Sequence, residues 1–191
     1  LFAGMTMTGK ILSSFFCAVT PRTAGFNTVN VSGLTDASKL LTVILMFIGG
    51  APGSTAGGIK VTTIVVLLVY LKANLTRTVG YNIFGRRLED DALRKSAAVF
   101  CTNLFLATTA ALILCALQNF NGLDTLLEVI SAISTVGMTA GLTTQLNMIS
   151  RMVVILLMYL GRVGSLSFAM SFTDKKKIAH VMQPAEKINI G

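Results

Sequence analysis

The chain has 191 residues, of which 53% are hydrophobic and 13% are charged, with a net charge of +8 and a mean hydropathy of +0.73. Soluble domains carry about 25% charged residues, so this composition excludes an ordinary soluble domain and indicates a membrane protein. The sequence opens in apolar residues at Leu1, without an initiator Met or the basic start of a signal peptide, and we expect a piece of a longer protein.

The basic residues fall into two blocks and do not form a surface that would bind nucleic acid. The first block is Lys72, Arg77, Arg86, Arg87, Arg94 and Lys95, and the second is Lys175, Lys176, Lys177 and Lys187. Residues 118–149 contain no Lys or Arg. Because basic loops mark the cytoplasmic side of a membrane protein, both blocks are predicted to be cytoplasmic and residues 118–147 to face outward.

Three apolar stretches are long enough to cross a membrane, and they lie at residues 40–71, 96–117 and 147–172. The first is longer than one span requires. Two further stretches, residues 10–19 and 123–133, contain about ten residues each and are too short for the roughly 30 Å hydrocarbon core. They are predicted to be re-entrant half-helices.

A shift of 112 residues relates the two halves of the chain. A Thr-x-Gly motif follows each short stretch, at residues 23–25 and 135–137. The same shift relates Gly49 to Gly161, and we expect each glycine to interrupt the long helix that contains it. The sequence therefore predicts an all-α membrane protein with one complete helix–half-helix–turn–helix unit and most of a preceding one.

A half-helix followed by a turn brings bare backbone to the middle of the membrane, where it is tolerated if it is buried or lines an aqueous path. Glycine in Thr-x-Gly can adopt dihedrals that point successive carbonyls the same way. Rings of such carbonyls replace the hydration shell of a potassium ion. Two copies favour an ion filter, and the alternative is that each copy is a simple tight turn.

The segment MFIGGAPGSTAGGIKV (46–61) places five glycines inside an apolar run. A phosphate-binding loop needs Lys directly after its second glycine and then Ser or Thr, whereas Ile59 intervenes here and Val61 follows Lys60. Nucleotide binding is therefore not expected. The composition suits an irregular loop in a water-filled cavity, and the alternative is a structural kink.

Arg162 lies within an apolar stretch, where a charge costs at least about 2.5–3.5 kcal/mol on insertion scales and needs a cavity or a partner. It stands 112 residues after Gly50, so we expect it to approach the same cavity and raise an electrostatic barrier to cations. The alternative is a packing anchor. Asp124 and Glu128 in the second half-helix are interpreted as helix-capping, packing or outer-mouth charges.

Four motifs resemble the Ktr/Trk/HKT superfamily of cation transporters, most closely its KtrB-type subunits. They are TPRTAGFNTV (20–29), FIGGAPGSTAGGIKVTT (47–63), ISTVGMTAGLT (133–143) and LGRVGSLSF (160–168). The resemblance implies four helix–pore helix–helix repeats around one potassium path, of which this chain carries the third and fourth. It divides the chain into most of the third repeat, with its broken second helix (1–72), a basic cytoplasmic linker (73–95), the fourth repeat (96–173) and a basic cytoplasmic tail (174–191).

The resemblance also implies roles for individual residues. Potassium would be bound by the filter backbone at Thr23, Ala24, Gly25, Phe26, Thr135, Val136, Gly137 and Met138. The intramembrane gate would comprise Gly49, Gly50, Pro52, Gly53, Ser54, Thr55, Gly57, Gly58, Lys60 and Arg162. Potassium is the implied ion, sodium is a candidate coupling ion, and no organic cofactor is expected.

The implied partners are a second copy of the protein, a cytoplasmic nucleotide-binding regulatory subunit of the KtrA type, and membrane lipids, in the plasma (inner) membrane. Lys175–Lys177 suit either the regulatory subunit or anionic lipid headgroups. Two rival functions remain, a secondary cation carrier and a non-conducting assembly subunit, although the parallel repeats disfavour a carrier built from inverted repeats. The sequence shows no catalytic constellation, so we do not expect an enzyme.

Overall fold

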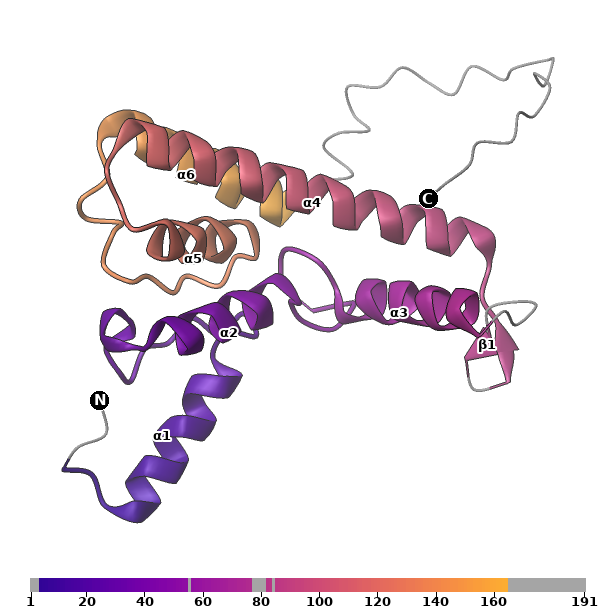
Figure 1. Ribbon diagram of the computed structural model, residues 1–191, viewed down its shortest axis with the longest axis horizontal. Helices are drawn as coiled ribbons and strands as arrows, with labels where there is room; N and C mark the ends of the chain where they lie inside the picture. The colour runs from indigo at the N-terminus through magenta and orange to yellow at the C-terminus, as the bar shows by residue number, and fades with distance from the viewer. Residues whose placement is uncertain (1–3, 55, 77–81, 84, 165–191) are drawn as a thin grey trace.

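The computed structural model describes residues 4–54, 56–76, 82–83 and 85–164. In these ranges the regular secondary structure is helical apart from one short antiparallel hairpin, and loops connect the elements (Figure 1). Its elements are α1 (Met7–Val19), η1 (Val31–Gly33), α2 (Asp36–Phe47), α3 (Val61–Leu75), β1 (Asn82–Ile83), β2 (Arg86–Arg87), α4 (Asp90–Leu117), α5 (Gly122–Ile133) and α6 (Met148–Val163). The predicted helical fold is confirmed, and the hairpin is an unexpected addition within the basic linker.

In the described part of the chain, α4 is the one helix long and apolar enough to cross a membrane. It begins before the predicted residue 96 because Asp90 and Asp91 occupy its first turn, where negative side chains favour a helix N-terminus. Lys95 pairs with Asp91 at 2.6 Å on the exposed surface of this added turn. The extension is therefore charged and lies outside the apolar span.

The long apolar stretch 40–71 is divided as expected into α2 and α3, which lie end to end in Figure 1. Between them, residues 49–60 form an excursion that we call the glycine loop. The Gly49 N–H donates to the Ile59 carbonyl at 2.9 Å, and the Val61 N–H donates to the Gly50 carbonyl at 3.2 Å. These bonds close the base of the loop, so the helix axis is interrupted and then resumes.

The two half-helices are also confirmed as short helices, since α1 has 13 residues and α5 has 12. At 1.5 Å per residue each is about 18–20 Å long, which is less than the hydrocarbon core. α1 contributes no buried residue and stands apart from the other helices in Figure 1. α5, in contrast, lies between α2 on one side and α4 and α6 on the other in Figure 1.

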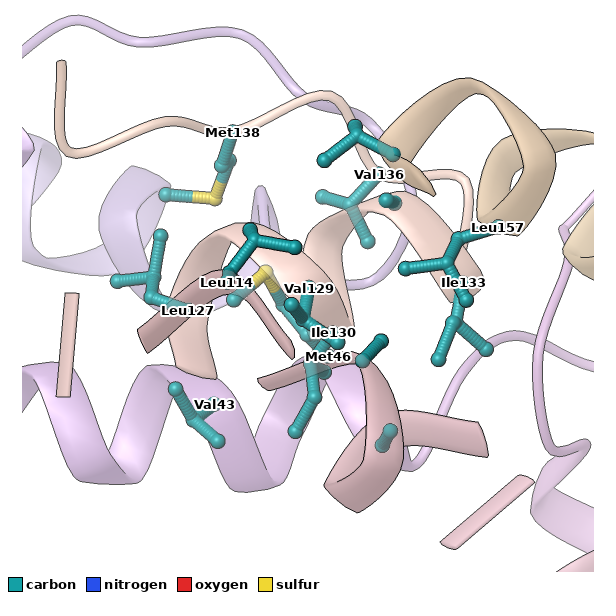
Figure 2. Close-up of a cluster of buried hydrophobic side chains, with 14 of the residues drawn as sticks. Val43, Met46, Leu114, Leu127, Val129, Ile130, Ile133, Val136, Met138 and Leu157 are labelled. Carbon is teal, nitrogen blue, oxygen red and sulfur yellow. The ribbon is translucent and has the colours of Figure 1, made fainter. Parts of the chain in front are cut away.

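The hydrophobic core is assembled around α5 (Figure 2). Leu127, Val129 and Ile133 of this helix are at most 2% exposed. They pack with residues from the three helices that surround α5, namely Met46 of α2, Leu114 of α4 and Leu157 of α6. Because the residues from Leu127 to Ile133 are all buried, α5 can hold the turn that follows it in a fixed position.

The expected interruption of the last helix at Gly161 is wrong. α6 continues through Val163 and ends where the Gly164 N–H donates to the Leu160 carbonyl at 3.0 Å. Gly161 is needed for close packing instead: a Cβ built on it would lie 1.9 Å from the carbonyl oxygen of Ile133. Gly49 is restricted in the same way, because a Cβ on it would lie 2.9 Å from the carbonyl oxygens of Gly57 and Ile59, so close packing requires glycine at both matched positions.

Gly161→Ala is expected to destabilise the protein by about 3 kcal/mol or more, because overpacking costs typically 1–3 kcal/mol and the clashing atom belongs to the backbone. Thermal unfolding of the purified protein in detergent measures the effect. Gly122→Ala is the matched control, since a Cβ at Gly122 meets nothing within 4 Å. Equal melting temperatures for the two variants would contradict the prediction.

Candidate functional site

The first Thr-x-Gly turn leaves the C-terminal end of α1 and is held by Thr20. The Thr20 carbonyl accepts from the N–H groups of Ala24 at 3.1 Å and Gly25 at 3.3 Å, and its Oγ1 donates to the Phe26 carbonyl at 2.7 Å. Thr23 has a φ of 71° and Gly25 a φ of 74°. A positive φ is uncommon for a residue with a side chain, so the backbone of this turn is strongly constrained.

The second turn, after α5, repeats this backbone pattern. Thr135 has a φ of 54° and Gly137 a φ of 87°, whereas Val136 between them, like Ala24, has no positive φ. The Val136 N–H donates to the Ser131 carbonyl at 2.9 Å. A positive φ at the first and third residues of each turn lets successive peptide groups face the same side, and carbonyl oxygens that face one side can coordinate a cation. Both turns therefore have a backbone suited to presenting a row of like groups to an ion.

The two turns are brought into direct contact although they are separated by more than a hundred residues. A Cβ built on Gly25 would lie 2.0 Å from the Val136 carbonyl oxygen and 3.7 Å from the Gly137 Cα. Glycine is thus required at position 25 by sterics as well as by its φ. The structure brings residues 23–26 and 135–138 to one place.

The glycine loop lies against the second turn. The Gly57 N–H donates to Thr135 Oγ1 at 2.9 Å, and Gly57 is buried. A Cβ on Gly57 would lie 2.6 Å from Thr135 Oγ1, and one on Gly58 would lie 2.9 Å from Ser134 Oγ. The loop is glycine-rich here because its backbone approaches the turn too closely for any side chain.

The remaining gate candidates differ in their surroundings. Lys60 folds back so that its Nζ donates to the Ala56 carbonyl within the loop. Pro52, Gly53 and Ser54 form the exposed tip, where Ser54 Oγ donates to the Ala51 carbonyl at 2.6 Å. Thr55 lies outside the described residues. The loop therefore has a buried base beside the turn and an exposed tip.

Arg162 is exposed on α6. It lines neither the cavity beside the first turn nor the cavity beside the second turn. Its neighbour Gly161 is the residue that meets the loop, because the Gly161 carbonyl oxygen lies 3.0 Å from where a Gly57 Cβ would be. The loop is thus confined between the second turn and the last part of α6.

A cavity of about 440 Å³ lies beside the second turn. It is lined by α5, α6 and the segment after the turn: Glu128, Ser131, Ala132, Thr135, Val136, Gly137, Met138, Thr139, Thr143, Val154 and Met158. A second cavity, of about 230 Å³, lies between the first turn, α1 and α2. Among the described residues no three His, Cys, Asp or Glu side chains gather. The oxygen atoms of the two turns themselves are backbone carbonyls and the hydroxyls of Thr23 and Thr135.

Two buried polar contacts were not predicted from the sequence. Lys39 of α2 and Asp124 of α5 form an ion pair at 2.7 Å, with side chains 7% and 20% exposed. Glu128 is 5% exposed and bonds to Thr143, which bonds onward to Thr139 at 3.0 Å. A lysine at the edge of an apolar stretch was the available signal for the first contact, but the sequence gives no indication of its partner.

Comparison with known proteins gives the family. The sequence matches the family described as TrkH, cation transport protein, over residues 2–181. It is 36% identical to the potassium/sodium uptake protein NtpJ of Enterococcus hirae, covering 97% of this chain and 43% of that protein. It is also 36% identical to the Ktr system potassium uptake protein B of Bacillus subtilis, covering 95% of this chain and 41% of that protein.

Among solved structures, the potassium transporter TrkH of Vibrio parahaemolyticus has a similar fold, with a TM-score of 0.74 at 22% identity. The match covers 91% of this chain and 39% of that one, so the chain spans about two fifths of the length of the proteins it matches. The fold of this chain agrees with the family that its sequence matches. The chain belongs to the TrkH family of cation transport proteins, which are membrane transporters and not enzymes.

Proposed function

We propose that this chain supplies two of the four segments that line the potassium path of a Ktr-type uptake transporter. The observation that carries the proposal is the pair of turns with matching φ signs, each placed after a half-helix of similar length and in contact with the other. The filter backbone would comprise Thr23–Phe26 and Thr135–Met138. In this assignment residues 1–72 and 96–173 are the third and fourth repeats of the transporter.

The chemistry of the turns suits a dehydrated monovalent cation. Carbonyl oxygens replace the hydration shell of potassium. α1 ends at Val19 and α5 at Ile133, shortly before the turns that begin at Thr23 and Thr135. The C-terminal end of a helix carries a partial negative charge, which favours a cation there. Two relatives are described as taking up potassium, or potassium and sodium, so we propose potassium as the transported ion and sodium as the candidate coupling ion.

The glycine loop would act as the gate. Gly57, which is buried, and Gly58, which is half-buried, lie against Thr135 and Ser134. Ser134 immediately precedes the second filter segment, and Thr135 begins it. A loop in this position narrows the path when it is docked and opens it when it is displaced. Lys60 and Arg162 would add positive charge on the cytoplasmic side of the filter and so oppose the passage of cations.

The number of filter segments indicates how the ion path would be completed. A carbonyl ring needs about four contributors, so the two segments of this chain would be completed by other parts of the same polypeptide. The resemblance to KtrB-type subunits implies a homodimer in the plasma membrane, with a nucleotide-binding regulatory subunit on its cytoplasmic face. The basic linker at residues 73–95 would lie on that face, and Arg86 and Arg87 of β2 are exposed there. The proposed cytoplasmic tail and Lys175–Lys177 lie outside the described residues.

Rubidium uptake into liposomes tests this function. The full-length transporter that contains this sequence is reconstituted intact and with residues 53–57 deleted, and uptake is measured with potassium or sodium as competitor. We expect uptake that potassium inhibits and that rises on deletion, because the loop no longer docks on Thr135. Absence of uptake by both forms of folded protein would overturn the transport function, and unchanged uptake on deletion would overturn the gate.

A further inference from the structure

We propose that Lys39 and Asp124 form a brace between the third and fourth repeats that sets ion selectivity. The inference rests on the proposed function, because it concerns how the second filter segment is positioned. Neither residue touches the turns: the ion pair lies near the N-terminal end of α5, whereas the turn begins after its C-terminal end at Ile133. Both are therefore positioning residues.

The pair is built into the interior. Lys39 is 6% exposed, and its Nζ lies 2.7 Å from Asp124 Oδ1. A buried ammonium is strongly unfavourable without a paired anion, so Lys39 holds Asp124 in place. The carboxylate also occupies the first turn of α5, where the helix dipole favours a negative charge. The ion pair therefore attaches the first turn of α5 to α2.

A rigid helix transmits this constraint to the filter. α5 is about 18 Å long at 1.5 Å per residue, and every residue from Leu127 to Ile133 is buried. Closely packed elements shift as units and do not deform continuously. A displacement of the α5 N-terminus therefore moves Thr135–Met138 relative to the first turn, which they contact at Gly25. A change in that distance alters the size of the carbonyl ring.

Of the two half-helices, α5 carries the acidic partner of the brace and α1 does not. The 112-residue shift that relates the two halves places Leu12 of α1 at the position equivalent to Asp124. α1 therefore has no carboxylate there, and the pair joins α2 of the third repeat to α5 of the fourth. We expect its removal to change the fourth filter segment and to leave the third segment in place.

The test uses Lys39→Met, Asp124→Asn and the double variant in the full-length transporter, with rubidium uptake measured against sodium competition. Asp124→Asn leaves a buried charge unpaired, so it is expected to lower both the melting temperature and the preference for rubidium over sodium. The preference should fall by roughly fivefold, within the range of coupling energies measured for residues in contact. In the double variant the melting temperature should recover, but the selectivity should not, since the brace is still missing.

Several outcomes separate the possibilities. Selectivity that recovers together with the melting temperature, or that never changes, would overturn the brace and leave the pair as a stabilising contact. If Asp124→Asn does not fold, Asp124→Glu and Lys39→Arg keep both charges but change the length of the bridge, and unchanged selectivity in both would also overturn it. Lys95→Met removes the exposed pair with Asp91 and is the control. Lack of uptake by the unmutated transporter would instead refute the proposed function.

Discussion

Replacing Gly25 with alanine is expected to reduce selective rubidium uptake at least about thirtyfold. The new Cβ would lie 2.0 Å from the Val136 carbonyl oxygen, and the residue would keep a φ of 74° that disfavours a side chain. Positive-φ strain and overpacking each cost about 1–3 kcal/mol, and a total of about 2 kcal/mol already corresponds to a factor of roughly thirty. The turns can relieve the clash only by moving apart, which widens the proposed ion site.

Gly137→Ala is the matched comparison for Gly25→Ala. Gly137 has a φ of 87°, but in the described part of the chain a Cβ on it meets nothing within 4 Å. It is expected to cost the strain without the clash and so to reduce uptake less. Uptake of rubidium with potassium and sodium as competitors, normalised to the amount of folded protein, measures both variants. A Gly25→Ala transporter that is as active and selective as the unmutated one would contradict the assignment of this turn to the filter.

Gly57→Ala is expected to raise rubidium uptake by about fivefold or more. The added Cβ would lie 2.6 Å from Thr135 Oγ1 and 3.0 Å from the Gly161 carbonyl oxygen, so the loop cannot keep its 2.9 Å hydrogen bond to Thr135. Loss of a hydrogen bond costs about 0.5–1.5 kcal/mol, and 1 kcal/mol is enough for a fivefold shift toward the displaced loop. Initial uptake rates in liposomes measure the change.

Gly53→Ala is the control for the gate variant: it brings the strain of a side chain at a φ of 83°, but its Cβ at the exposed tip of the loop meets nothing within 4 Å. It leaves the contact with Thr135 intact, and we expect uptake close to that of the unmutated transporter. If Gly57→Ala gave folded protein with unchanged or lower uptake, docking of the loop on Thr135 would not restrict the path. The loop would then be a structural kink, the alternative that the sequence left open.

The local features of the site could be predicted from the sequence because short-range patterns encode them. The half-helices α1 and α5 were evident from apolar stretches too short for a span, and the loop at Gly49–Lys60 from glycines within a long one. The repeat of Thr-x-Gly located both turns. The assignment of these turns to a filter, and of the loop to a gate, stays a prediction that the uptake experiments test.

The same reasoning failed where a residue's role depends on what packs against it. Gly161 was expected to break a helix, but it lies within α6. Glycine is needed at this position because the Ile133 carbonyl leaves no space for a side chain. Asp124 was interpreted from its place at a helix N-terminus alone. Its partner Lys39 stands 85 residues earlier, and no periodicity links the two.

The amino-acid sequence by itself determined the membrane class, the order of helices and half-helices, and the positions of the turns and of the glycine loop, because composition, length and local backbone preference are properties of a segment. Tertiary structure alone decided which segments meet: Gly25 with Val136, Gly57 with Thr135, and Lys39 with Asp124. These contacts depend on the packing of α2, α5 and α6 around a shared core, and the distances between atoms from remote segments exist only once that core has formed.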